Sequence, residues 1–181
     1  HLPEQEVLGI PTGEDPHRVL AERCRGAVSR RYPSANEALR QRVESRLEDE
    51  LAVIAALGYP AYFLTVAEVT DLIRAKGVRV AARGSGAGSL VNHLLGISGV
   101  DPIRHDLLME RFCTTLRAEL PDIDVDVESA RPTEIYEAIL ERFGGERVTC
   151  VSMMDTYKVR HAVRDVGAAL GMPPAEVDEI A

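Results

Sequence analysis

One short segment, residues 120–127, constrains the fold more than any other part of the chain. Within it, aspartates alternate with β-branched apolar residues: Asp122, Asp124 and Asp126 against Ile123, Val125 and Val127. Successive side chains of a β-strand point to opposite faces, so the alternation predicts a strand with one buried face and one acidic face. Neighbouring carboxylates on the acidic face would lie about 6.5–7 Å apart along the strand.

Carboxylates placed in this way indicate a metal site. They repel one another unless cations lie among them, and oxygen ligands of this kind suit Mg²⁺. Two such ions about 3.5–4 Å apart can clamp an in-line phosphoryl displacement. We therefore expect Asp122, Asp124 and Asp126 to hold two Mg²⁺ ions. An exposed edge strand kept soluble by its acids is the alternative. An EF-hand is excluded, because Val127 and Thr133 stand where that loop requires glycine and glutamate.

A second motif, Arg83–Ser89, is rich in glycine and serine and joins a strand predicted over 78–82 to a helix predicted over 90–95. Glycines let the backbone approach an anion, and a helix N-terminus offers free N–H groups. Ser85 and Ser89 would add hydroxyl donors and Arg83 a positive charge. The motif is compatible with a phosphate-binding loop, and a flexible glycine turn is an equal alternative. It matches neither the Walker A loop nor the G-x-G-x-x-G loop.

The wider pattern indicates an α/β fold behind a helical segment. Helices are predicted from about Val19 to Tyr32, from a Ser34 cap with Glu37 in a capping box to about Leu57, and over 62–75. From residue 78 onward, strands (78–82, 123–127 and 148–153) alternate with helices. The last two helices would begin at Asp155 or Thr156 and at Pro173. We divide the chain into 1–76, 77–155 and 156–181.

On the helix after residue 156, two arginines share one face. Arg160 and Arg164 lie four residues apart, while the apolar residues of the same helix predict a buried stripe of Val159, Val163, Val166 and Leu170. Arginines that face a carboxylate-metal site suit the binding of phosphates. Surface residues or ion-pair partners are the alternative.

Composition excludes some classes of protein. With 45% hydrophobic residues the chain can bury a core, whereas 4% aromatics and no tryptophan argue against a base-stacking platform. The net charge of −8 neither proves nor forbids binding to nucleic acid. No apolar run predicts a membrane helix. Cys24, Cys113 and Cys150 show no pairing pattern, so we expect three small buried side chains in a reducing cytoplasm.

Several segments, in order along the chain, together resemble the C-family bacterial DNA polymerase III alpha subunits. They are Gly58–Leu64, Arg83–Leu90, Leu95–Ile97, Val100–Ile103, Leu107–Phe112, Pro121–Asp126 and Val163–Gly167. The resemblance implies a palm of the polymerase-β nucleotidyltransferase type. In it, Asp122 and Asp124 would be the catalytic, metal-binding aspartates, and Asp126 completes the motif.

The same resemblance implies further contacts. Gly84 and Ser85 would lie at the incoming deoxynucleoside triphosphate, and Arg83 and Arg117 on phosphates. Arg160 stands where lysine is more usual. Primer-template DNA would be the substrate. A third catalytic aspartate, and the surfaces for a sliding clamp and other replisome or repair subunits, would lie outside this chain. The sequence thus looks like an excised fragment, expected to bind metal weakly and to extend no primer alone.

Some segments depart from the common pattern. Val127-Glu128 replaces a usual phenylalanine, and residues 113–116 replace an Asn-Pro turn. Residues 149–157 look more like the error-prone, translesion branch than like the main replicase. Two alternatives stay open: a free-standing nucleotidyltransferase with Glu134 or Asp155 as third carboxylate, and a non-catalytic, palm-shaped binding module.

Overall fold

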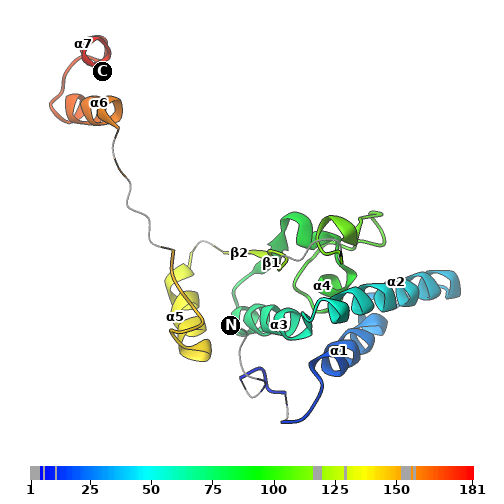
Figure 1. The fold of residues 1–181 in the computed structure, drawn as a ribbon. Helices are drawn as coiled ribbons and strands as arrows, with labels where there is room; N and C mark the ends of the chain where they lie inside the picture. Colours follow the sequence, from blue (N-terminus) through cyan, green and yellow to red (C-terminus); the bar gives the residue numbers. More distant parts are fainter. Residues whose placement is uncertain are drawn as a thin grey trace. The chain divides into compact units, whose positions relative to one another are not determined.

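A computed structural model describes residues 5, 7–10, 12–115, 120–128, 130–151, 156 and 158–181. The chain forms two compact units, His1–Val148 and Thr149–Ala181. Figure 1 shows the order of their elements, with the helices α1–α5 and a small sheet in the first unit and α6 and α7 in the second. The three-part division that the sequence suggested stays a prediction.

The N-terminal half is helical, as expected, in α1 (Pro16–Arg31), α2 (Glu37–Ala56) and α3 (Pro60–Ala75). Asp15 caps α1 by accepting a hydrogen bond from the His17 N–H. The expected Ser34 cap is wrong. Asn36 caps α2 instead, because its side chain accepts the Leu39 N–H at 2.9 Å and lies directly before the first helical residue.

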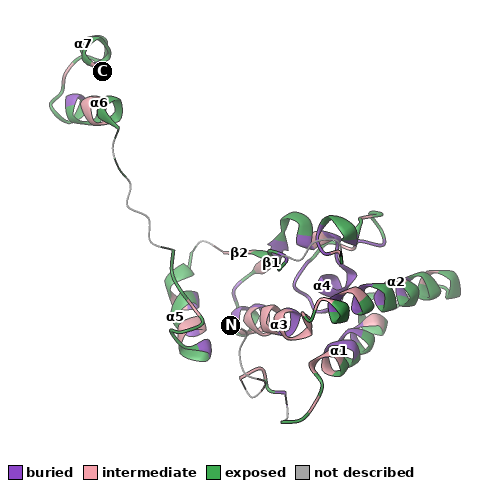
Figure 2. Ribbon diagram, viewed as in Figure 1, coloured by how far each residue is buried: buried purple, intermediate pink, exposed green. Residues whose placement is uncertain are grey.

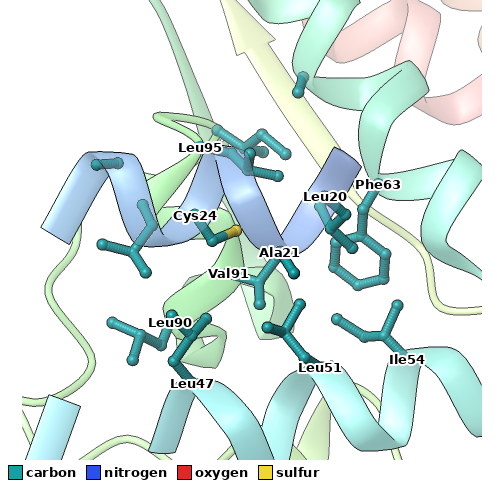
Figure 3. Close-up of a cluster of buried hydrophobic side chains, with 14 of the residues drawn as sticks. Leu20, Ala21, Cys24, Leu47, Leu51, Ile54, Phe63, Leu90, Val91 and Leu95 are labelled. Carbon is teal, nitrogen blue, oxygen red and sulfur yellow. The ribbon is translucent and has the colours of Figure 1, made fainter. Parts of the chain in front are cut away.

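The main core lies among α1, α2, α3 and the short α4 (Leu90–Leu94). Figure 3 shows side chains of α1 facing those of α2 across this core, and α4 is buried throughout (Figure 2). The largest contributors are Leu20, Leu47, Leu51, Ile54, Phe63 and Leu90. Their removal from water supplies the main driving force for this part of the fold.

The sheet consists of two antiparallel strands, β1 (Val80–Arg83) and β2 (Asp124–Val127). Val80 lies opposite Val127, and Arg83 lies opposite Asp124. A second apolar cluster, formed by Ile73, Val78 and Ile135, packs α3 and α5 (Pro132–Phe143) against the sheet. Val80 and Val127 pack against this cluster.

The strand expected over 148–153 is not found where the structure describes it. Residues 148–151 are not in a strand, and residues 152–155 lie outside the described residues. Among the residues that the structure describes, no strand follows α5. The fold is a mixed helical structure with a small two-stranded sheet, which is compatible with the expected α/β class.

Two short 3₁₀ helices, η1 (Gly84–Gly88) and η2 (Met109–Arg111), flank the sheet. Cys24 and Cys113 are buried, as expected, and burial raises the pKa of the Cys24 thiol to about 12. Cys150 is exposed, contrary to expectation, because the strand expected there is not found in its described residues.

The second unit contains α6 (Val159–Ala169) and α7 (Pro174–Ile180). Gly167 of α6 lies against Val177 of α7, and Arg164 bonds Asp178 at 2.6 Å. The stripe expected to be buried on α6 is wrong for Val159, Val166 and Leu170, which are exposed. α7 is only seven residues long and covers little more than Gly167.

Among the described residues, no single helix is long and apolar enough to cross a membrane. α2 and α3 together would meet such a test of length and composition, but the chain bends by 112° between them.

Candidate active site

The aspartate segment has the two unlike faces that its alternation predicts. Asp122, Asp124 and Asp126 are exposed, whereas the apolar residues between them are half-buried. Ile123 packs against the main core, and Val127 against the cluster of α3 and α5. Packing on one side thus directs the three carboxylates to the other.

Tyr62 fixes the start of this segment to the helical core. Its hydroxyl donates a hydrogen bond of 2.7 Å to the carbonyl oxygen of Pro121, the residue before Asp122. The ring packs edge-on against Phe63, which in turn packs edge-on against Phe112. Burial raises the pKa of the Tyr62 hydroxyl, which therefore remains a donor at neutral pH.

Arg83 connects the glycine loop to the acids. Its Nε donates to Asp126 Oδ1 at 2.9 Å, and its Nη1 lies 3.7 Å from Asp124 Oδ2. This follows from the register, because Arg83 lies opposite Asp124 and diagonal to Asp126 on the same face of the sheet. The hydrogen bond to Asp126, followed by the charges of both acids, raises the pKa of Arg83. All three side chains are more than half exposed.

The exposed part of the loop lies directly beside Asp124. Gly84 has a φ of +69°, which favours glycine, and a Cβ built on it would lie 3.6 Å from Asp124 Oδ2. Ser85 is also exposed. A cavity of about 320 Å³ adjoins the loop, lined by Gly84, Ser85, Ala87, Gly88, Leu107, Leu108 and Arg111. Arg111, which the sequence did not single out as a contact, is the cation of this cavity.

The inner part of the loop differs from the open helix end that the sequence suggested. Ser89 is fully buried, and its hydroxyl donates to the carboxylate of Glu50 at 2.9 Å. Glu50 also accepts the N–H groups of Leu90 and Val91. The first donors of α4 are thus bonded inside the protein, and Ser89 presents no hydroxyl to a ligand at the surface.

Comparison with known proteins shows the family of the chain. The family model described as the bacterial DNA polymerase III alpha NTPase domain matches residues 18–181. The chain belongs to the bacterial DNA polymerase III alpha family. An error-prone DNA polymerase of Pseudomonas aeruginosa is 41% identical over 172 residues, which cover 95% of this chain and 16% of that protein.

Further relatives carry the same name. Error-prone DNA polymerases of Methylococcus capsulatus and Symbiobacterium thermophilum are 41% and 39% identical, over 95% and 94% of this chain. The resemblance that the motifs indicated, including the error-prone branch, is confirmed. The chain spans about 16% of the length of these DNA polymerase III alpha relatives and is a region of a longer polymerase chain.

The sequence singled out four other residues: Arg117, Asp155, Arg160 and Glu134. Arg117 and Asp155 lie outside the described residues. Arg160 is exposed on α6, in the second unit. Glu134 bonds Arg131 through both carboxylate oxygens, at 2.6 and 2.7 Å, on α5.

Within the described part of this polymerase III alpha region, no group of three or more His, Cys, Asp or Glu residues could hold a metal ion together. The donor set nevertheless fits Mg²⁺, which needs only one or two protein carboxylates when substrate phosphates supply further ligands. Asp122 and Asp124 are exposed carboxylates of this kind, and Asp124 lies beside the glycine loop.

Proposed function

We propose that this region forms the palm core of a DNA-directed DNA polymerase, of the polymerase-β nucleotidyltransferase type, that adds deoxynucleotides to a primer 3′ end. The observation that carries the proposal is the meeting of Asp124, Arg83 and Gly84 at one end of the two-stranded sheet. Membership of the DNA polymerase III alpha family supports it.

In this proposal each exposed group has its own role. Asp122 and Asp124 hold two Mg²⁺ ions through carboxylate oxygens. Ser85 and the N–H groups of the exposed turn donate to the triphosphate, and Arg83 neutralises its charge. Asp126 anchors Arg83 at the edge of the site. When bound, Mg²⁺ would activate the primer 3′-hydroxyl and offset the charge that develops on the phosphates.

The partners of the whole protein are part of the same proposal. Primer-template DNA and deoxynucleoside triphosphates would meet at this site. A sliding clamp and other replisome or repair subunits would bind through other regions. Because the relatives are error-prone polymerases, we propose translesion synthesis during DNA repair in the cytoplasm.

Primer extension by the full-length polymerase that carries Asp124→Asn tests the proposal. Mutating only the groups that hydrogen-bond a metal ligand lowers activity about 10–100-fold. Mutating the ligand itself should therefore lower primer extension by more than about 100-fold. The matched control is Glu128→Gln, which removes an equal charge from the residue that follows β2. Glu128 pairs with the exposed Arg79. Normal extension by Asp124→Asn would overturn the proposal.

A further inference from the structure

The most completely buried charge described in the first unit lies beneath the glycine loop. Glu50 is 1% exposed, and its carboxylate accepts four hydrogen bonds at 2.7–3.1 Å. The donors are the Ser89 hydroxyl, the N–H groups of Leu90 and Val91, and Arg46 Nε. A carboxylate at the N-terminus of a helix also interacts favourably with the helix dipole. Glu50 thus fixes the junction between the loop and α4.

Arg46 extends this connection to the other wall of the cavity. Its Nη2 donates to the carbonyl oxygens of Gly88 and Leu107, at 3.2 and 3.3 Å. The two walls approach closely, since a Cβ on Gly88 would lie 2.7 Å from the Leu108 carbonyl oxygen. Arg46 therefore holds both segments that line the cavity beside Gly84 and Ser85.

A pair of this kind is not needed for stability alone. Burying two charges costs desolvation energy, and apolar residues of similar size often stabilise a core as well or better. Glu50 follows Leu47 and precedes Ile54 on the buried side of α2, where an apolar residue would fit the pattern. What the pair supplies is a fixed position, because its hydrogen bonds set the distance from α2 to the loop.

We propose that Glu50 and Arg46 are positioning residues that set the glycine loop for the incoming nucleotide. The inference rests on the proposed function. Neither residue touches the nucleotide. They act through Ser89 and Gly88, which carry the exposed residues Gly84 and Ser85 to their place beside Asp124. Small displacements of binding groups have large effects on reactions that depend on orientation.

The test is steady-state primer extension by the full-length polymerase with Glu50→Gln, Arg46→Gln or Arg46→Lys. In Glu50→Gln, the amide N–H group of glutamine would face N–H and O–H donors whose hydrogen bonds the Glu50 carboxylate accepts. We expect Glu50→Gln and Arg46→Gln to raise the KM for the nucleotide about tenfold, as loss of supporting contacts does elsewhere, with kcat within about threefold. Arg46→Lys keeps the charge without the planar fork, and its KM should lie between those of the unchanged enzyme and Arg46→Gln.

The matched control, Glu48→Gln, changes an exposed acid of the same helix and should keep the KM of the unchanged enzyme.

A KM equal to that of the unchanged enzyme in Arg46→Gln, with only a lower melting temperature, would overturn the inference. Arg46→Gln decides the question even if Glu50→Gln fails to fold, because the Arg46 side chain is 22% exposed and Glu50 keeps its three other hydrogen bonds. Asp124→Asn separates the two proposals. If that variant extends primers normally, the proposed function fails. If it is inactive while Glu50→Gln and Arg46→Gln keep the KM, only the positioning inference fails.

Discussion

Single side chains at the end of the sheet compete for the same partners. Arg83 contacts Asp126 directly and Asp124 at longer range, so its guanidinium shares the carboxylates with any divalent ion. The ion pair is exposed, and exposed pairs contribute little to stability. The contact is therefore easily exchanged, which suits a group that is proposed to neutralise substrate phosphates.

Replacing Arg83 by alanine should change metal and nucleotide binding in opposite directions. On the 181-residue chain, we expect the affinity for Mn²⁺ to rise a few-fold in calorimetric titration, because the carboxylates lose a competing cation. In the full-length polymerase, the KM for the nucleotide should rise. Arg79→Ala removes another exposed arginine, which pairs with Glu128, and is the control. Weaker Mn²⁺ binding by Arg83→Ala would contradict the competition.

At the level of elements, the loop between β1 and α4 depends on close backbone packing. Gly88→Ala would place a methyl group 2.7 Å from the Leu108 carbonyl oxygen, so the loop or the 107–108 segment must shift. We expect the free energy of unfolding in urea to fall by about 1–3 kcal/mol. Gly26→Ala, where a Cβ meets nothing within 4 Å in α1, should leave stability equal or higher. Equal effects of the two changes would contradict this packing.

The elements also show what a sequence can and cannot predict. The alternation at 122–127 and the glycines at 84–88 are local signals, and both are found in the expected strand and turn. The pairing of β1 with β2 joins residues that are about 40 positions apart in the sequence. Glu50 likewise bonds the N-terminus of α4 across about 40 positions. No local pattern encodes such contacts. One signal was present: Glu50 lies on the same side of α2 as the buried Leu47 and Ile54.

Across the first unit, one polar cluster joins α1 to the segment after α4. The Tyr32 hydroxyl donates to Asp101 at 2.7 Å, and its ring lies 5.9 Å from that of the buried His93. Burial lowers the pKa of His93, and the positive charge of Arg31 lowers it further by a smaller amount. The Asp101 carboxylate acts in the opposite direction and raises this pKa. His93 is therefore held in its neutral form within the core.

This cluster predicts a loss of stability in mild acid. Since the folded pKa of His93 lies below the ordinary value of 6.5, the unfolded chain binds more protons as the pH falls through about 6.5. The free energy of unfolding should then decrease by at most about 1.4 kcal/mol per pH unit. Melting temperatures between pH 7.5 and 5 should fall less in His93→Gln than in the unchanged chain. His105→Gln, at an exposed position, should keep the full dependence, and identical slopes for all three proteins would exclude His93 as the cause.

The position of Glu50 has a consequence for selectivity. In many nucleotide-binding folds a substrate phosphate rests on the end of a helix, but here a resident side chain takes that place before any substrate arrives. Under the proposed function, discrimination between a triphosphate and a shorter nucleotide would depend on groups that reach solvent and on the ions that they bind. Because the turn is already held by these hydrogen bonds, a ligand that binds it should lose little ordering entropy there.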